Sequence, residues 1–101
     1  MYSVKTEKHT LNGNSVNLKS CEGPYEELLL QVSGSGSITV TGALECDLDP
    51  VGVAVINMAT LEKVENIAES GIYLLPTKGL KSCILTATGQ VDVFAKFLQN
   101  S

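Results

Sequence analysis

Apolar and polar residues alternate along most of this chain with a period of two, and this pattern constrains the fold more than any other feature. The clearest example lies near the end of the chain. There the apolar residues Val91, Val93, Ala95 and Phe97 alternate with a second set, Asp92, Phe94 and Lys96. Successive side chains of a β-strand point to opposite faces of the sheet. Each alternating segment is therefore predicted to be a strand with at least one buried face.

Turn-forming residues separate these segments at intervals of about 8–12 residues, which is typical of a sandwich or barrel. They are Asn12-Gly13, Gly23-Pro24, the Ser/Gly run at 33–37, Asp49-Pro50, Ser70-Gly71, Lys78-Gly79 and Thr88-Gly89. Asn12-Gly13 is typical of a tight hairpin turn. The Ser/Gly run is predicted to be a loop within one domain, because neither half of a chain of 101 residues is long enough to fold alone. We therefore predict an all-β fold, namely an antiparallel β-sandwich that is jelly-roll-like, with about eight short strands.

The first residues carry few apolar side chains. The polar run at 5–10, Lys-Thr-Glu-Lys-His-Thr, precedes the first strong turn. Such a segment has little to bury and is predicted to form an N-terminal arm, residues 1–12, that is flexible until it docks on a partner. Residues 13–101 are then predicted to form the sandwich domain.

One segment, 57–70, is ambiguous. Met58, Leu61, Val64 and Ala68 lie at helical spacing, and Gly71 would suit the position after a helix C-terminus. The alternative is a hairpin, with strands at 54–58 and 61–67 joined by a turn at Ala59-Thr60. Periodicity alone leaves helix and hairpin open.

The charges exclude some partners. The net charge is −4 and all seven basic residues are Lys. Arg is the residue that best recognises phosphates and base edges, so neither nucleic acid nor an anionic membrane is an expected partner. The mean hydropathy of +0.16 is high for a domain with so few aromatic residues. It indicates additional surface that is buried against a protein partner, and we expect a homo-oligomer.

The chain has three cysteines, Cys21, Cys46 and Cys83, and none belongs to a Cys-x-x-Cys motif. An odd number without this spacing argues against a disulfide framework or a structural zinc site. Reduced thiols in a protein assembled in the cytoplasm are the better prediction. No apolar stretch near the N-terminus is typical of a signal peptide, and none is long enough to span a membrane.

Few residues suggest chemistry. Glu45, Asp47 and Asp49 alternate, so in an extended chain their carboxylates would point the same way and could hold Ca²⁺. The more common reading is a solvent-exposed strand end before an Asp-Pro turn, and we expect no cofactor. His9 is the only histidine and lies in no nucleophile motif. The chain is therefore predicted not to be an enzyme.

The aromatic residues favour packing over ligand binding. Trp is absent, so a sugar-stacking platform would be thin. Phe94 and Phe97 lie on opposite faces if the last strand is regular, and one of them then packs in a second buried layer or at an interface. The candidate interface residues are Tyr2, Val4, Phe94 and Phe97.

The second half of the chain carries five short motifs in order, at 36–42, 55–61, 70–73, 78–81 and 89–93. They include a Gly-x-Tyr strand at 71–73, a Gly-Leu turn at 79–80 and a Val-x-Val strand at 91–93. Their order and spacing resemble those of small β-sandwich structural proteins of tailed-phage particles. These comprise capsid decoration or cement proteins, head-fibre proteins and related tail-associated domains. In two places the chain departs from that pattern: the loop at 45–50 lacks the family's Trp, and Lys81 stands where Arg is common.

The resemblance implies a capsid decoration protein of a phage or prophage, assembled in the bacterial host cytoplasm and located in the virion. Its implied partner is the major capsid protein or another virion protein, and the implied oligomer is a trimer at three-fold sites of the shell. It also favours the hairpin over the helix at 57–70. The alternatives are a tail or fibre module, a carbohydrate-binding module and a calcium-dependent adhesion domain.

Overall fold

The computed structural model describes residues 2–18, 27–45, 47–77 and 80–100, and the side chains of these except for 2–4, 99 and 100. Eleven strands are formed within these ranges. They are β1 (Tyr2–Asn12), β2 (Ser15–Asn17), β3 (Glu27–Gly34), β4 (Ser37–Ala43), β5 (Val51–Gly52), β6 (Val55–Asn57), β7 (Lys63–Val64), β8 (Asn66–Ile67), β9 (Gly71–Pro76), β10 (Ser82–Thr88) and β11 (Gln90–Asn100). The described ranges contain no helix that could cross a membrane.

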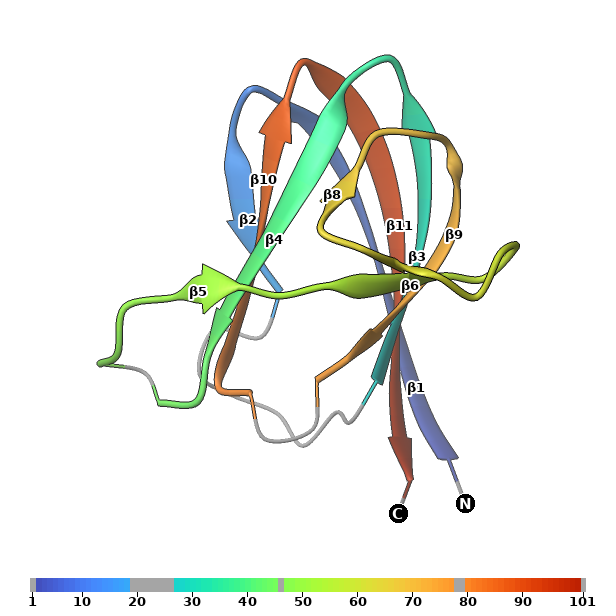
Figure 1. Cartoon of the computed structure of the whole chain (residues 1–101). Coiled ribbons are helices and arrows are strands. Elements are labelled where there is room, and N and C mark those ends of the chain that lie inside the picture. Colours follow the sequence, from blue (N-terminus) through green and yellow to red (C-terminus); the bar gives the residue numbers. More distant parts are fainter. Residues whose placement is uncertain (1, 19–26, 46, 78–79, 101) are drawn as a thin grey trace.

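The strands form two packed sheets (Figure 1). One has six strands in the order β1-β11-β3-β9-β6-β7, and the other has five, with the order β2-β10-β4-β5 and with β8 beside β4. From β1 to β4 the chain alternates between the two sheets, and from β9 to β11 it does so again. This alternation is the jelly-roll connection, so the predicted antiparallel β-sandwich is confirmed. β5 and β8 both pair with β4, at different places along it, and together they fill one strand position of the jelly roll. Nine of the eleven strands therefore occupy the eight predicted positions, and the remaining two, β6 and β7, form an added hairpin.

The core lies between the sheets and follows the period-two pattern. Alternate residues of β3 and β11 are buried on the six-stranded side, and alternate residues of β4 and β10 are buried on the other. The largest of them are Leu28, Leu30, Ile38, Val40, Leu85, Val91, Val93 and Phe97. Burial of this apolar surface is the main favourable term in folding such a domain.

Residues 2–12, predicted to be an arm outside the sandwich, form the edge strand β1. They pair with β11 along their whole length, from Tyr2 opposite Asn100 to Asn12 opposite Gln90. An edge strand has only one neighbouring strand, and its inner side is partly open to solvent, so it can form from a largely polar sequence. Within β1, Leu11 is packed in the core. The low apolar content of residues 2–12 therefore indicated an arm although these residues form a strand.

The turn at Asn12-Gly13 was predicted to be a hairpin, and that pairing is wrong. β1 pairs with β11 whereas β2 pairs with β10, so the turn carries the chain from one sheet to the other. The backbone at Gly13 has a φ of 69°, which glycine adopts without strain.

The segment 57–70 is a hairpin that continues into the other sheet, and it contains no helix. In β6 and β7, Val55 lies opposite Val64. The turn is held by Asn57, whose side-chain oxygen accepts a hydrogen bond from the amide of Ala59 at 2.9 Å. Ile67 then pairs with Ile38 in the five-stranded sheet and is buried. These contacts across the fold outweigh the local helical spacing.

Candidate interaction face

One side of the six-stranded sheet turns away from the five-stranded sheet, and its side chains alternate with those of the core. We call this surface the outer face and define it by Leu29, Gln31, Ile56, Met58, Ile72, Leu74, Phe94, Lys96 and Leu98, with Met58 included because its amide donates a hydrogen bond of 3.0 Å to the carbonyl of Ile72. Seven of these nine residues are apolar. An antiparallel sheet with solvent on one side commonly carries polar residues there, so this composition is unusual for a free surface.

The strand register brings the outer-face residues side by side. In one row Phe94 of β11 lies opposite Gln31 of β3, and Gln31 lies opposite Ile72 of β9. In the next row Lys96 lies opposite Leu29, and Leu29 lies opposite Leu74. Phe94 is 44% exposed and Ile72 is 49% exposed. Large apolar side chains therefore meet solvent in the middle of a continuous sheet.

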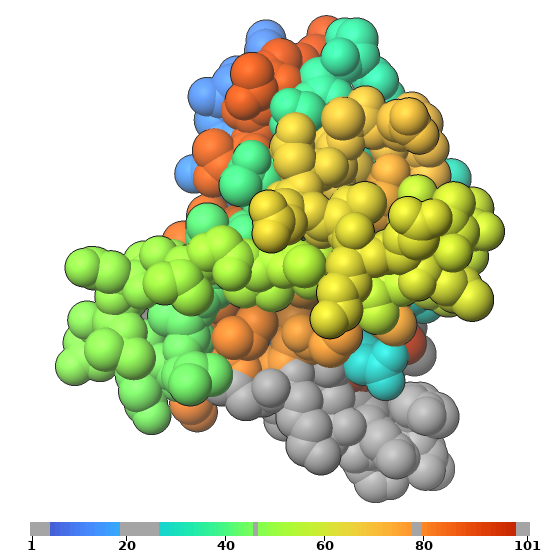
Figure 2. All heavy atoms as spheres, in the orientation of Figure 1, coloured from blue at the N-terminus to red at the C-terminus, as the bar shows by residue number. Residues whose placement is uncertain are grey.

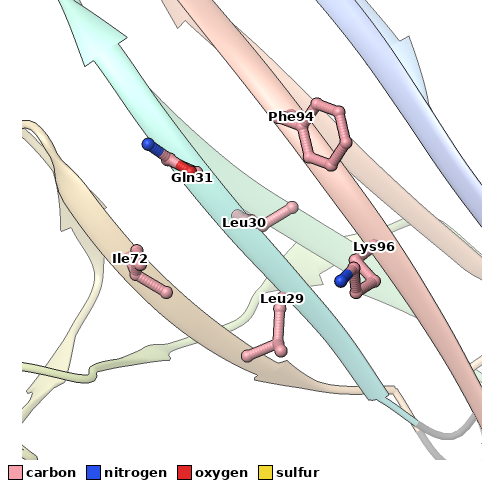
Figure 3. Close-up of a pocket in the computed structure, with 6 residues that line it drawn as sticks. All are labelled: Leu29, Leu30, Gln31, Ile72, Phe94 and Lys96. Carbon is pink, nitrogen blue, oxygen red and sulfur yellow. The ribbon is translucent and has the colours of Figure 1, made fainter.

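A hollow of about 170 Å³ opens on this surface (Figure 3). Its lining comes from three adjacent strands, and comprises Leu29, Leu30, Gln31, Ile72, Phe94 and Lys96. The hollow is mostly apolar, with one amide and one ammonium group available to polar partners. It suits an inserted apolar side chain better than a substrate that must be held by many polar contacts.

Lysines border the apolar centre. Lys96 lies in the row of Leu29, Lys8 of β1 lies opposite Phe94, and Lys63 of β7 lies opposite Ile56. All three are exposed. Asp92 and Glu27 stand at the two ends of the face, opposite Ser33 and Leu98. The border is thus mainly basic, although the whole chain is acidic.

The segment after β4 stands out from the body of the molecule (Figure 2). We call it the acidic loop and define it by Leu44, Glu45, Asp47, Leu48, Asp49 and Val51. All six residues are exposed, and Leu48 is 53% exposed. A hydrogen bond of 3.3 Å from the amide of Leu48 to the carbonyl of Glu45 closes a turn.

The proposed calcium ligands Glu45, Asp47 and Asp49 all lie in the acidic loop. Within the described ranges, no three His, Cys, Asp or Glu side chains are grouped so as to hold a metal ion. The structure therefore presents these three residues as surface carboxylates between exposed apolar side chains.

The inner side of β1 carries a polar ladder. Glu7 is its centre: its Oε2 lies 2.8 Å from Lys5 Nζ, and its Oε1 lies 2.8 Å from His9 Nε2. The Lys5 ammonium lowers the pKa of the Glu7 carboxyl below its ordinary value, and His9 adds to this effect. Lys5 also lies over the ring of Phe97, 5.1 Å from its centroid. Charged groups on the inner side of an edge strand discourage pairing with a further strand, so β1 is a poor docking edge.

The predicted interface residues fall in different places. Phe94 is exposed on the outer face, whereas Phe97 is buried in the core. Tyr2 and Val4 lie in β1 opposite Asn100 and Leu98, and their side chains are outside the described part. Cys83 is buried in the core, whereas Cys21 and Cys46 lie outside the described residues.

Sequence reasoning missed Leu29, Ile72 and Leu74, which form the centre of the outer face. A signal was present in the apolar runs at 28–30 and 72–75. A strand with apolar residues on both of its faces needs a second covering layer, and here one of its faces has none in the described part of the chain.

No protein-family model matches the chain, and no curated protein matches it significantly in sequence. Solved structures do match its fold. The SPBc2 prophage-derived protein YomS has a TM-score of 0.74 at 15% identity, over 98% of this chain and 96% of that one. The PBSX exported protein XepA has a TM-score of 0.75 at 14% identity, over 96% of this chain. The match spans 39% of XepA, so the chain corresponds to one part of that protein.

An enzyme shares the architecture more distantly. RmlC from Streptococcus suis, solved in complex with dTDP-D-xylose, has a TM-score of 0.54 at 10% identity, over 97% of this chain and 44% of that one. At these identities each likeness shows a common fold alone. The two stronger likenesses are to proteins of prophages.

Proposed function

We propose that this chain is a non-catalytic structural protein of a phage or prophage particle, most specifically a capsid decoration protein. It binds and stabilises the shell, and its outer face is buried against a neighbouring protein of the particle. The observation that carries this proposal is the outer face itself, an apolar surface that spans the adjacent strands β11, β3, β9 and β6. Contiguous exposed apolar surfaces of this kind mark sites of protein association.

The fold supports the phage assignment. YomS, which matches over nearly all of both chains, is described as derived from a prophage, and XepA is described as a protein of PBSX. The proposal extends that association to this chain and adds a location, the virion.

The distribution of polar groups supports a role without catalysis. Among the described buried side chains, the oxygen-bearing ones are Tyr73, Thr77 and Ser82, and the others are apolar or Cys. His9 is engaged with Glu7 on the inner side of β1, away from the hollow on the outer face. General acid–base or nucleophilic chemistry needs such groups to converge on one reacting position.

Particle purification tests the proposal. Particles released by the encoding phage or prophage are separated on a density gradient, and the chain is quantified by mass spectrometry against the major capsid protein. A copy number proportional to that of the capsid protein supports decoration of the shell. A few copies for each particle supports the tail or fibre module instead, and absence from the particles contradicts both.

A second candidate rests on the description of XepA as an exported protein. By this alternative the chain acts outside the particle after leaving the host cell. The same gradient separates the two ideas, because an exported protein stays in the soluble medium fraction while particles sediment.

A further inference from the structure

Two exposed surfaces of this molecule are complementary in both charge and hydrophobicity. The outer face has an apolar centre bordered by three lysines, Lys8, Lys63 and Lys96, and by two carboxylates at its ends, so its border is basic by one net charge. The acidic loop has three carboxylates interleaved with three exposed apolar side chains, those of Leu44, Leu48 and Val51. A basic border around an apolar hollow matches an acidic border around apolar side chains.

The sizes are also compatible. The hollow of about 170 Å³ between Leu29, Ile72 and Phe94 is lined mainly by carbon atoms. A leucine side chain is small enough to enter a space of this size, and Leu48 stands at the turn of the acidic loop. Removing such a side chain from water favours the contact.

The two surfaces cannot meet within one molecule. The acidic loop connects β4 to β5, and both strands belong to the five-stranded sheet. The outer face belongs to the six-stranded sheet and points away from the five-stranded one. The core therefore separates them, and a contact between loop and face requires two copies.

We propose that copies of this chain assemble head to tail, with the acidic loop of one copy docked on the outer face of the next. Leu48 enters the hollow, and Asp47 approaches Lys96. This inference deepens the proposed function, on which it rests for its biological setting, by naming a second copy as the occupant of the outer face. A head-to-tail contact uses two different patches and closes into a ring or continues as a filament.

Charge reversal tests the contact in the purified full-length protein, by light scattering coupled to size exclusion across a range of concentrations. Wild-type protein is expected to form assemblies of three or more copies. Lys96→Glu disables the face and Asp47→Lys disables the loop, so each variant alone is expected to associate about tenfold more weakly or worse. The double variant Lys96→Glu/Asp47→Lys restores opposite charges and is expected to recover assembly.

Mixing the two single variants gives the sharpest result. Lys96→Glu keeps its original loop, and Asp47→Lys keeps its original face, so these two surfaces can dock. The two altered surfaces also carry opposite charges, so a second productive contact is available and the two variants can alternate. The mixture is therefore expected to regain the assembly that neither variant shows alone. A pairing of two outer faces with each other would instead leave Asp47→Lys assembling like wild type.

The control is Glu65→Lys, which makes the same charge change as Asp47→Lys at another exposed position, between β7 and β8. It is expected to assemble like wild type, and circular dichroism should show all variants folded. Wild type that stays monomeric at every concentration overturns the inference, as does a double variant that fails to recover. Because these measurements need no particle, a monomer that still sediments with particles refutes this inference and leaves the proposed function standing. A protein that assembles in solution but is absent from particles refutes the proposed function and leaves this inference standing.

Discussion

Phe94 and Phe97 lie three residues apart on β11 and face opposite sides of the six-stranded sheet. Phe97 is 1% exposed and packs in the core, whereas Phe94 stands on the outer face beside the hollow. Phe97→Ala should therefore destabilise the fold by about 3–5 kcal/mol, because it leaves a cavity. Phe94→Ala should cost about 1 kcal/mol or less.

Urea unfolding of both variants measures this difference. The same ring is removed from the same strand in each case, so each variant is the control for the other. Equal losses of stability would contradict the assignment of the two faces.

The ion pairs of Glu7 make stability depend on pH. Lys5 lowers the pKa of Glu7 in the folded protein below its ordinary value of 4.5, so the unfolded chain binds this proton more readily. The resulting stabilisation is present above the ordinary pKa and is lost as the pH falls through the lowered one. It amounts to less than about 1 kcal/mol for a pair this exposed.

Thermal unfolding between about pH 6 and pH 3 tests the role of Glu7. Glu7→Gln is expected to lose less stability than wild type over this range. Lys5→Met removes the ammonium group that chiefly lowers the pKa of Glu7, so this variant should also lose less stability than wild type as the pH falls. Identical pH slopes in all three proteins would count against the ion pair.

Tyr73 contributes through its hydroxyl, which donates a hydrogen bond of 2.8 Å to the carbonyl of Glu69. Tyr73→Phe should cost about 0.5–1.5 kcal/mol at neutral pH. Burial raises the pKa of Tyr73 above its ordinary value of 10.0, and the charge of Glu69 adds to this. The unfolded chain then loses the proton first, so wild type is destabilised as the pH rises above that value.

The stability difference between wild type and Tyr73→Phe should accordingly shrink in alkaline solution. Chemical unfolding at neutral pH and above about pH 10 measures it. A difference that stays constant or widens would contradict the buried, hydrogen-bonded state of this hydroxyl.

Leu61 occupies the left-handed region, with a φ of 61°, and its side chain is 73% exposed. This conformation costs a residue with a β-carbon roughly 1–2 kcal/mol, whereas glycine adopts it freely. Leu61→Gly is therefore expected to raise the free energy of unfolding by about 0.4–1 kcal/mol. Leu61→Ala keeps the β-carbon and serves as the matched control, expected to stay near wild type. A glycine variant less stable than the alanine variant would refute this account of the turn.

The sandwich could be predicted from the sequence because its evidence is local. Alternation at 91–97 and glycines at the turns directly reflect strand geometry and backbone conformation. The edge strand was missed since a strand with one neighbour needs little apolar content, and only Leu11 is tightly packed there. At 57–70 the sequence was compatible with both a helix and a hairpin. The hairpin forms because the segment pairs with strands that are distant in the chain.

The outer face could be predicted in part. Phe94 was recognised because it alternates with core residues, and the apolar run at 28–30 carried a similar signal. Its position beside Ile72 and Leu29 depends on register across β11, β3 and β9, which no single segment encodes. The complementarity of the acidic loop likewise appears only once the two sheets are placed.

Lysine footprinting of intact particles tests most directly whether the outer face is buried in the assembled structure. Particles and free protein are acetylated under the same conditions, and modification is quantified at Lys96 and at Lys5. Lys96 lies on the outer face, and Lys5, whose side chain is 50% exposed, lies on the inner side of β1. Strong protection of Lys96 in particles with little change at Lys5 is the predicted result. Equal labelling of Lys96 in particles and in free protein would contradict the account.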